Sequence, residues 1–512
     1  MSPQAQNFDS YGSFIRTLDT KTNQIPDQGP GTPSIPYVEM DEKWGLISDL
    51  IGGTGDMRNA GEAWLPREER ESFIQYRARL GRSYLYNAYA NTVDRVVAKP
   101  FSKNVILKGE EDLPEQLAFL ETDADGQGGD ITQVAREVFE LGVAYGISYI
   151  FVDYPYVEGI NLATQRQQKV HPYFVVIHPR DLIGWRTEKN EATGQPEVVD
   201  VRIKEELILP AGEYGEVKKE VVFCFRGNGT WTRYLYEDED DAWTVHSEGT
   251  HTYPGVPLIP FYTHKMGPML AEPALMDLAW LNLCHWQSYS DQRNILRIAR
   301  MPILHQAGVT EEELEEPITL GPFNAVRSID PDAKMSFVEH SGKAIGAGRD
   351  DLKDLEIQME VLGMQPFVQP AVKSRTATEV VGVESRTMTT IQAWIRSLEN
   401  VIETAYMFAA TWVGVELPED FAVDVFNEFG LSFKSEQDIR ALDAARMRGD
   451  ISHTTYLREL KRRGIISDDI SVAQEVEDKL RLQEPLVAEA PPTQDLGEGE
   501  QDFSVDMQLG TV

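Results

Sequence analysis

The feature that most constrains the fold of this chain is a pair of predicted long helices separated by an irregular insertion. Residues 272–300 contain no proline after Pro273, and at about 1.5 Å per residue a helix over this range would be roughly 43 Å long. Met301-Pro302 ends the stretch, and the helical spacing of apolar residues returns only at 344–362. This arrangement is unusual in a compact single domain.

The remaining patterns predict a chain of the α+β class. Asp130 has the position of a helix N-cap, Gly146 that of a C-cap, and residues 67–98 have the apolar spacing of a helix. Strands are predicted at 148–154, 173–177, 182–186, 198–204, 220–225, 230–236, 243–246, 303–306, 325–329, 335–339 and 421–433. A third long helix is predicted over 377–413, with shorter helices at 113–121 and within 435–482.

Both ends of the chain predict little regular structure. Residues 1–41 are rich in Pro, Gly, Gln and Asp and have weak apolar periodicity, which favours a flexible arm. Residues 484–512 contain seven acids and no Lys or Arg, which is typical of a disordered acidic tail.

Composition limits the classes of function. The chain has 48 Lys and Arg against 83 Asp and Glu, a formal net charge of −35 with neutral His. This balance argues against a protein that coats itself in nucleic acid, because such proteins neutralise phosphates with a basic face. The acids serve either solubility or a surface that meets DNA without gripping it. Cys224 and Cys284 are too few for a disulfide framework, and with no visible secretory signal or membrane span they fit a reduced cytoplasmic compartment.

The chain carries no motif of a known catalytic or nucleotide-binding site. It lacks a GxxxxGK[ST] phosphate loop, an HExxH zinc helix and a GxSxG nucleophile elbow. Residues 123–126 begin like a calcium loop, but Thr132 stands where that loop needs Glu, so a polar turn is favoured. The five acids at 237–241 favour a solvated hairpin tip. We therefore expect no cofactor, no metal and no enzymatic activity.

Several short stretches, taken in order, resemble the portal proteins of tailed bacteriophages, which form the ring through which DNA enters the phage head. The central stretch is LAWLNLCHWQSYSDQRNILRIAR at 278–300. The others are WLP at 64–66, YNA at 86–88, AYG at 144–146, VDYP at 152–155, IPFYT at 259–263, PIL at 302–304, GP at 321–322, FVEH at 337–340, RDDLKDLE at 349–356 and TAT at 376–378. Each is weak alone, and their common order over about residues 60–465 carries the resemblance.

The resemblance implies a definite order of parts. These are a flexible arm over 1–41, a wing of mixed α/β structure over 42–271, a first stem helix over 272–300, a clip over 301–343, a second stem helix over 344–362, a tunnel loop over 363–376, a long kinked helix with a return to the wing over 377–434, a helical crown over 435–483 and the acidic tail over 484–512.

The resemblance also implies a passive ring of about twelve copies at one vertex of a virion, assembled in the host cytoplasm. Double-stranded DNA would pass through the ring without sequence specificity during packaging and ejection. The terminase large subunit, the major capsid and scaffolding proteins, and head–tail adaptor or neck proteins would dock on it, and no membrane is implied. Because no ATP motif is visible, a separate motor would supply the energy.

Candidate site residues follow from the same resemblance. On the stem helices, candidates for contact with a neighbouring copy or with DNA in the channel are Asp291, Arg293, Arg297, Arg300, Asp350, Asp351 and Asp354. In the tunnel loop, candidates that face DNA are Phe367, Val368, Lys373 and Arg375. In the clip, candidates for docking the motor and adaptors are Phe323, Val326 and Ile329. For the stem arginines, pairing with carboxylates of the neighbouring copy is favoured over contact with DNA.

Two alternatives stay open. The first is a head–neck adaptor or minor capsid protein, although adaptors are generally shorter and lack two helices around an insertion. The second is an acidic cytoplasmic hydrolase whose site is not recognised, which would lose activity when one pair of carboxylates is changed.

Overall fold

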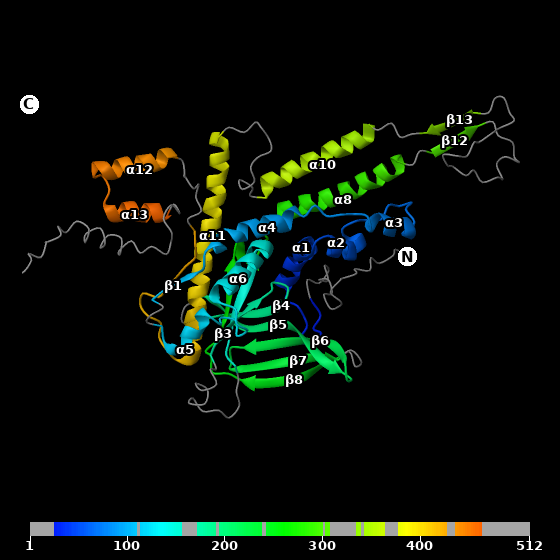
Figure 1. Cartoon of the computed structure of the whole chain (residues 1–512). Helices are drawn as coiled ribbons and strands as arrows, with labels where there is room; N and C mark the ends of the chain where they lie inside the picture. Colours follow the sequence, from blue (N-terminus) through cyan, green and yellow to red (C-terminus); the bar gives the residue numbers. More distant parts are fainter. Residues whose placement is uncertain are drawn as a thin grey trace, which may run out of the picture. The chain divides into compact units, whose positions relative to one another are not determined.

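The computed structural model describes residues 25–109, 113–155, 171–190, 194–237, 242–300, 303–307, 334–338, 343–363, 377–427 and 436–462. The chain divides into two compact units, Met1–Phe429 and Gly430–Val512 (Figure 1). The first unit combines helices with antiparallel sheets, so the predicted α+β class is confirmed.

The first helix overturns part of the predicted N-terminal arm. Helix α1 (Ile35–Gly52) begins inside the range 1–41, so the prediction of a flexible arm is wrong from Ile35 onward. Pro36 lies in the first turn of α1, where a missing N–H leaves no helical hydrogen bond unmade. Trp44 is fully buried, and its indole N–H donates to the carbonyl oxygen of Tyr145 at 2.9 Å. This contact ties α1 to the core.

The single helix predicted over 67–98 is two helices, α3 (Phe73–Leu80) and α4 (Ala88–Ala98), so that prediction is wrong. Ser72 and Asn87 are their N-caps, and each side chain accepts a backbone N–H of the following turn, at 3.3 and 3.1 Å. The apolar spacing continues across the break, and only the two polar caps mark it.

In the chain, helix α6 (Ile131–Tyr145) is followed directly by the first strand of a three-stranded sheet. Both of its predicted caps are confirmed: Asp130 Oδ1 accepts the Gln133 N–H at 2.8 Å, and Gly146 has a φ of +88°. A Cβ at Gly146 would lie 2.4 Å from the carbonyl oxygen of Glu272, so the position requires glycine. The antiparallel sheet has the order β3-β2-β9, with β2 (Ile147–Asp153), β3 (Tyr173–Ile177) and β9 (Leu258–Tyr262).

The predicted antiparallel region is a five-stranded meander. Its strands, in both chain and sheet order, are β4 (Leu182–Lys189), β5 (Pro196–Ala211), β6 (Gly215–Arg226), β7 (Thr230–Glu237) and β8 (Ala242–Thr250). Strands β5 and β6 are longer than predicted. Their far ends, 206–211 and 215–220, pair with each other and extend past β4 and β7.

The three predicted long helices are confirmed as α8 (Met276–Ala299), α10 (Lys343–Leu362) and α11 (Ala377–Val413). Helix α11 packs against β2 and β9, and the Trp394 indole N–H donates to the carbonyl oxygen of Thr263 at 2.8 Å. The large core lies between α11, this sheet, α6 and the N-terminal helices, and its fully buried side chains include Trp44, Tyr89, Phe139, Tyr149, Phe261, Ile391, Ile395 and Leu398.

The remaining elements are short. They are α2 (Thr54–Ala60), α5 (Glu115–Ala118), β1 (Ile106–Lys108) paired with β14 (Ala422–Asp424), and β10 (Lys265–Gly267) paired with β11 (Leu270–Ala271). The second unit contains α12 (Glu436–Arg448) and α13 (His453–Arg462). The strand predicted over 421–433 is confirmed only as β14, and the strand predicted over 325–329 lies outside the described residues.

Candidate functional site

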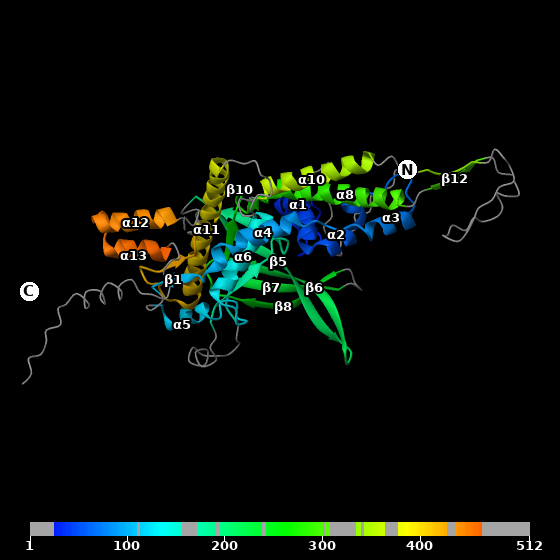
Figure 2. The same cartoon turned by 45° about the horizontal axis from the view of Figure 1, so that its top comes forward.

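The candidate site is the pair of helices α8 and α10, which lie side by side in both views of the chain (Figure 2). Their 24 and 20 residues correspond to lengths of about 36 and 30 Å. The segment between them contains β12 (Ile303–Ala307) and β13 (Lys334–Val338), which pair antiparallel with Ile303 opposite Val338. The chain therefore runs along α8, forms the two-stranded ribbon of β12 and β13, and runs back along α10.

The contact between the two helices includes a polar clamp near their ribbon end. The Gln292 side-chain amide donates to the carbonyl oxygen of Ile345 at 2.9 Å, and Gln292 is buried. A Cβ at Gly348 would lie 2.3 Å from Gln292 Oε1. Farther along α10, Leu352 and Met359 are buried seven residues apart, as expected for one face of a helix. The clamp and the apolar face fix how α10 lies on α8.

A buried histidine lies in the same helix pair. His285 is 1% exposed and packs against the rings of Tyr86 and Tyr289, at centroid distances of 5.4 and 5.9 Å. Its Nε2 atom is 3.7 Å from Glu356 Oε1, which is too long for a hydrogen bond. Burial lowers the pKa of His285, and the Glu356 charge opposes that shift. The imidazole is therefore neutral at neutral pH.

Side-chain amides of α8 form hydrogen bonds with α4 and with the segments that precede α4 in the chain. Asn282 is fully buried, its Oδ1 accepts the Tyr89 N–H at 3.0 Å, and its Nδ2 donates to the carbonyl oxygen of Tyr86 at 2.8 Å. Gln287 Nε2 donates to the carbonyl oxygen of Trp64 at 2.9 Å. These bonds satisfy polar groups inside the core and set the register of α8 against the N-terminal helices.

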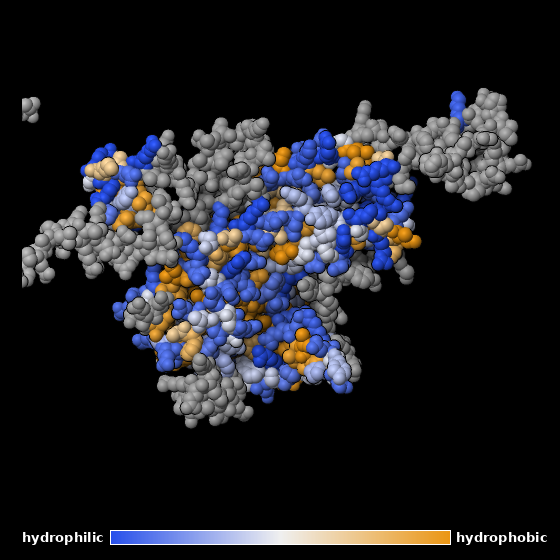
Figure 3. Space-filling view, in the orientation of Figure 1, coloured by the Kyte–Doolittle hydropathy of each residue, from blue (hydrophilic) through white to orange (hydrophobic). Residues whose placement is uncertain are grey.

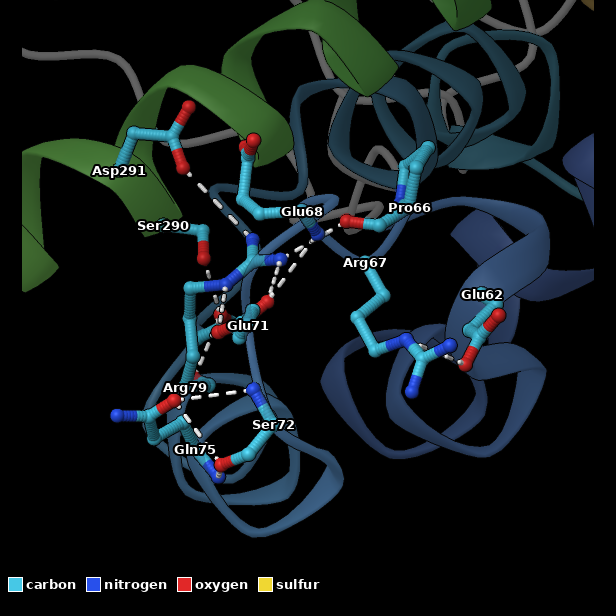
Figure 4. A network of polar contacts seen from close by, with 11 residues as sticks. Glu62, Pro66, Arg67, Glu68, Glu71, Ser72, Gln75, Arg79, Ser290 and Asp291 are labelled. Carbon is cyan, nitrogen blue, oxygen red and sulfur yellow. Dashed lines mark hydrogen bonds and ion pairs between the residues drawn. The ribbon is translucent and has the colours of Figure 1, made fainter.

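A buried arginine joins α3 to α8 (Figure 4). Arg79 is 4% exposed, and its Nε and Nη2 atoms donate to Glu71 at 3.0 and 2.9 Å. Nη2 also donates to the carbonyl oxygen of Pro66 at 2.8 Å, and Nη1 lies 3.7 Å from Asp291 Oδ1. The hydrogen bond from Arg79 lowers the pKa of Glu71. Ser83 and Ser290 add a hydroxyl–hydroxyl bond of 2.9 Å between the same elements.

The stem candidates lie on this helix pair. Arg293, Arg297 and Arg300 are exposed near the end of α8, and Asp350, Asp351 and Asp354 are exposed on α10. Within the described part of the chain, no ion pair joins these arginines to these aspartates. Asp291 is explained by a contact within the chain, since it faces Arg79.

The comparisons with known proteins bear on this part of the chain. A family described as a domain of unknown function (DUF4055) matches residues 274–413, which is the range from α8 to the end of α11. No curated protein matches.

Among solved structures, the chain is similar to one from "Neck of native GTA particle computed with C12 symmetry", with a TM-score of 0.40, 11% identity, and coverage of 79% of this chain and 98% of that chain. It is also similar to one from "Virion of native gene transfer agent (GTA) particle", with a TM-score of 0.40, 10% identity, and coverage of 74% and 89%. Likenesses at this TM-score establish neither a shared fold nor a shared function.

The other candidates lie outside the described residues. They are the tunnel-loop residues Phe367, Val368, Lys373 and Arg375 and the clip residues Phe323, Val326 and Ile329. Among the residues that the structure describes, no three His, Cys, Asp or Glu side chains gather to hold a metal ion, and no helix has the length and hydropathy to cross a bilayer.

Arg79, Asn282 and Gln292 were not predicted as site residues. Their signal is weak, because each is a polar residue at a helical position that faces the core. Asn282 stands between Leu281 and Leu283, and only such an interruption of an apolar run hints at a buried polar contact.

Proposed function

We propose that this chain is a portal-type subunit, a ring-forming structural protein at the head–tail junction of a phage-like particle. The observation that carries the proposal is the order α8, β12, β13, α10, α11, in which two long helices surround a ribbon-forming insertion and a third, longer helix follows. This order matches the stem, clip, stem and long helix that the sequence resemblance implies. A role in structure rather than in catalysis is part of the proposal.

In this proposal α8 and α10 form the stem, residues 301–343 the clip, residues 363–376 the tunnel loop and residues 435–483 the crown. The body of sheets and helices before α8 forms the wing. Terminase, capsid, scaffolding and neck proteins would be its partners, and the virion its location.

The charge of the chain suits a conduit for DNA. With a formal charge of −35 per copy, a ring of such chains repels a polyanion over most of its surface. Repulsion from all sides would keep duplex DNA centred and mobile, whereas a basic wall would bind it and stall it. Energy for transport would come from the motor that docks on the clip.

The test is the mass and shape of the purified full-length protein, measured by native mass spectrometry and by class averages from electron microscopy. We expect a closed ring of about twelve copies with a central hole wide enough for duplex DNA. A compact dimer or tetramer without a channel would refute the proposal.

A further inference from the structure

Two oppositely charged surfaces lie on either side of α8. The first, which we call the basic flank, consists of the exposed residues Phe73, Ile74, Arg77, Arg82 and Arg297, from α3, the loop after it and the end of α8. Segment 66–82 contains five Arg against three Glu, and segment 292–300 contains three Arg and no acid. In a chain of net charge −35, this is a local excess of positive charge.

Two arginines of the basic flank, Arg82 and Arg297, come from segments that the structure joins, since Ser83 next to Arg82 donates to Ser290 of α8 at 2.9 Å. The pKa of Arg82 is lowered, by desolvation first and then by the positive charge of Arg297, which is consistent with this proximity. Among the described residues, neither Arg82 nor Arg297 takes part in an ion pair. Two of the nearby acids, Glu71 and Asp291, face Arg79. Unpaired like charges held together are unfavourable unless an anionic partner covers them.

Exposed apolar side chains border these arginines. Phe73 is 57% exposed and Ile74 is 81% exposed, and the Arg77 guanidinium lies 5.6 Å from the centroid of the Phe73 ring. In Figure 3 an apolar spot borders strongly hydrophilic side chains where Figure 1 places α3 and the end of α8. Arginine beside an aromatic ring is typical of the centre of a protein–protein interface, whereas a DNA backbone offers nothing to an exposed isoleucine.

The second surface, which we call the acidic flank, is the outward stripe of α10 and consists of Asp350, Asp354, Ile357 and Val361. These positions are spaced by four, three and four residues, so they share one face of the helix. Ile357 and Val361 are 46% and 55% exposed. Among the residues that the structure describes, Asp350 pairs only with its neighbour Arg349, at 3.9 Å with both side chains 70% exposed, which is a weak pair. The stripe therefore combines negative charge with an apolar segment.

We propose that the basic flank of one copy packs against the acidic flank of the next copy. The two flanks are complementary in both respects, arginines against aspartates and Phe73 with Ile74 against Ile357 with Val361. Because α8 lies between α3 and α10 in Figures 1 and 2, the two flanks face different directions, and the contact is head-to-tail. Repeated head-to-tail contacts close into a ring when the rotation allows it. The inference rests on the proposed ring and names the two surfaces that would form the contact between copies. One of these surfaces includes α3, which is not part of the proposed stem.

Charge reversal and charge exchange test this contact in the full-length protein. The variant R82E/R297E reverses the basic flank, and D350K/D354K reverses the acidic flank. Each should raise the concentration for half-assembly at least about tenfold, as measured by sedimentation velocity and native mass spectrometry. The chain that carries all four substitutions should assemble again, since the charges are complementary once more. The matched control for R82E/R297E is R186E/K218E, which makes the same change in net charge on the five-stranded sheet, at side chains 67% and 62% exposed, and should assemble like the wild type.

The outcomes separate this inference from the proposed function. If the wild type forms a ring and both reversal variants, with folding verified by circular dichroism, form the same ring, the pairing of the flanks is overturned. The proposed portal function would then still stand. A wild-type chain that stays monomeric at all concentrations would overturn the proposed ring and the pairing with it. Loss of assembly in both reversals without recovery in the fourfold variant would also contradict the pairing.

Discussion

Removal of Arg79 tests whether the buried ion pair between α3 and α8 holds these elements together. In Arg79→Ala, Glu71 keeps a carboxylate whose side chain is 10% exposed and loses donors at 3.0 and 2.9 Å. The carbonyl oxygen of Pro66 loses its donor as well. Breaking a buried pair from one side costs about 3–5 kcal/mol, because the remaining charge stays buried without compensation. We expect a decrease of this size in the free energy of unfolding of the first unit.

The matched control is the exposed pair beside it in Figure 4. Arg67 Nε lies 3.9 Å from Glu62 Oε1, with side chains 45% and 57% exposed, so Arg67→Ala should cost about 0–1 kcal/mol. Urea unfolding followed by tryptophan fluorescence measures both losses, and hydrogen exchange over residues 66–83 shows whether the opening is local. An equal, small cost for the two variants would refute the assignment of a structural role to Arg79.

The pH dependence separates the ion pair from simple packing. Arg79 lowers the pKa of Glu71 below its ordinary value of 4.5, so the folded state binds the proton less readily than the unfolded state. The stabilisation by the pair is therefore present above about pH 4.5 and is lost as the pH falls through the folded-state pKa. The difference between wild type and Arg79→Ala should shrink in acid. A difference that stays constant into strong acid would assign the loss to packing.

Three further predictions concern single positions. Gly146→Ala forces a side chain at a φ of +88° against the carbonyl oxygen of Glu272 at 2.4 Å, and thermal melting should show a loss of about 2–4 kcal/mol. Gly348→Ala displaces only the end of the Gln292 side chain, at 2.3 Å, so urea unfolding should show a smaller loss of about 1 kcal/mol, the value of one hydrogen bond. Burial raises the pKa of Asp181 to about 6, above its ordinary 3.8, so the charged carboxylate destabilises the fold above pH 6. Asp181→Asn should therefore stabilise the protein by about 1–3 kcal/mol at pH 8 and hardly at all below pH 4. Thermal melts at both pH values measure this difference.

The long helices could be predicted from the sequence because their signals are local. Helices α8, α10 and α11 have sustained apolar periodicity and no internal proline, and the caps of α6 follow from Asp130 and Gly146. Helix α1 was not predicted, because prolines that precede and begin a helix give the same signal as a loop. The break between α3 and α4 was missed, since apolar spacing reports burial and does not report where the backbone turns.

The contacts that build the candidate site could not be predicted, because they join positions far apart in the chain. Arg79 meets Asp291, Tyr89 meets Asn282, and Ser83 meets Ser290. No local pattern relates these residues, and each is an ordinary polar position in its own segment. That the stem arginines pair with carboxylates of a neighbouring copy stays a prediction. The joining of α3 to α8 depends on how the chain folds back in space, which no local pattern records.

The polar contacts along α8 have a consequence for the proposed ring. Asn282, Gln287 and Ser290 bind groups on the N-terminal helices and loops. A slide of α8 by one turn would leave the buried polar atoms of Asn282 and Ser290 unpaired at about 1–3 kcal/mol each. Such contacts add little net stability compared with apolar packing, but they select one register among many. Copies that meet head-to-tail must present both flanks at one fixed angle, because a small error in each rotation accumulates around a ring and prevents closure. Buried polar side chains on α8 therefore suit a subunit in which the orientation of the helix pair matters more than a few additional kcal/mol.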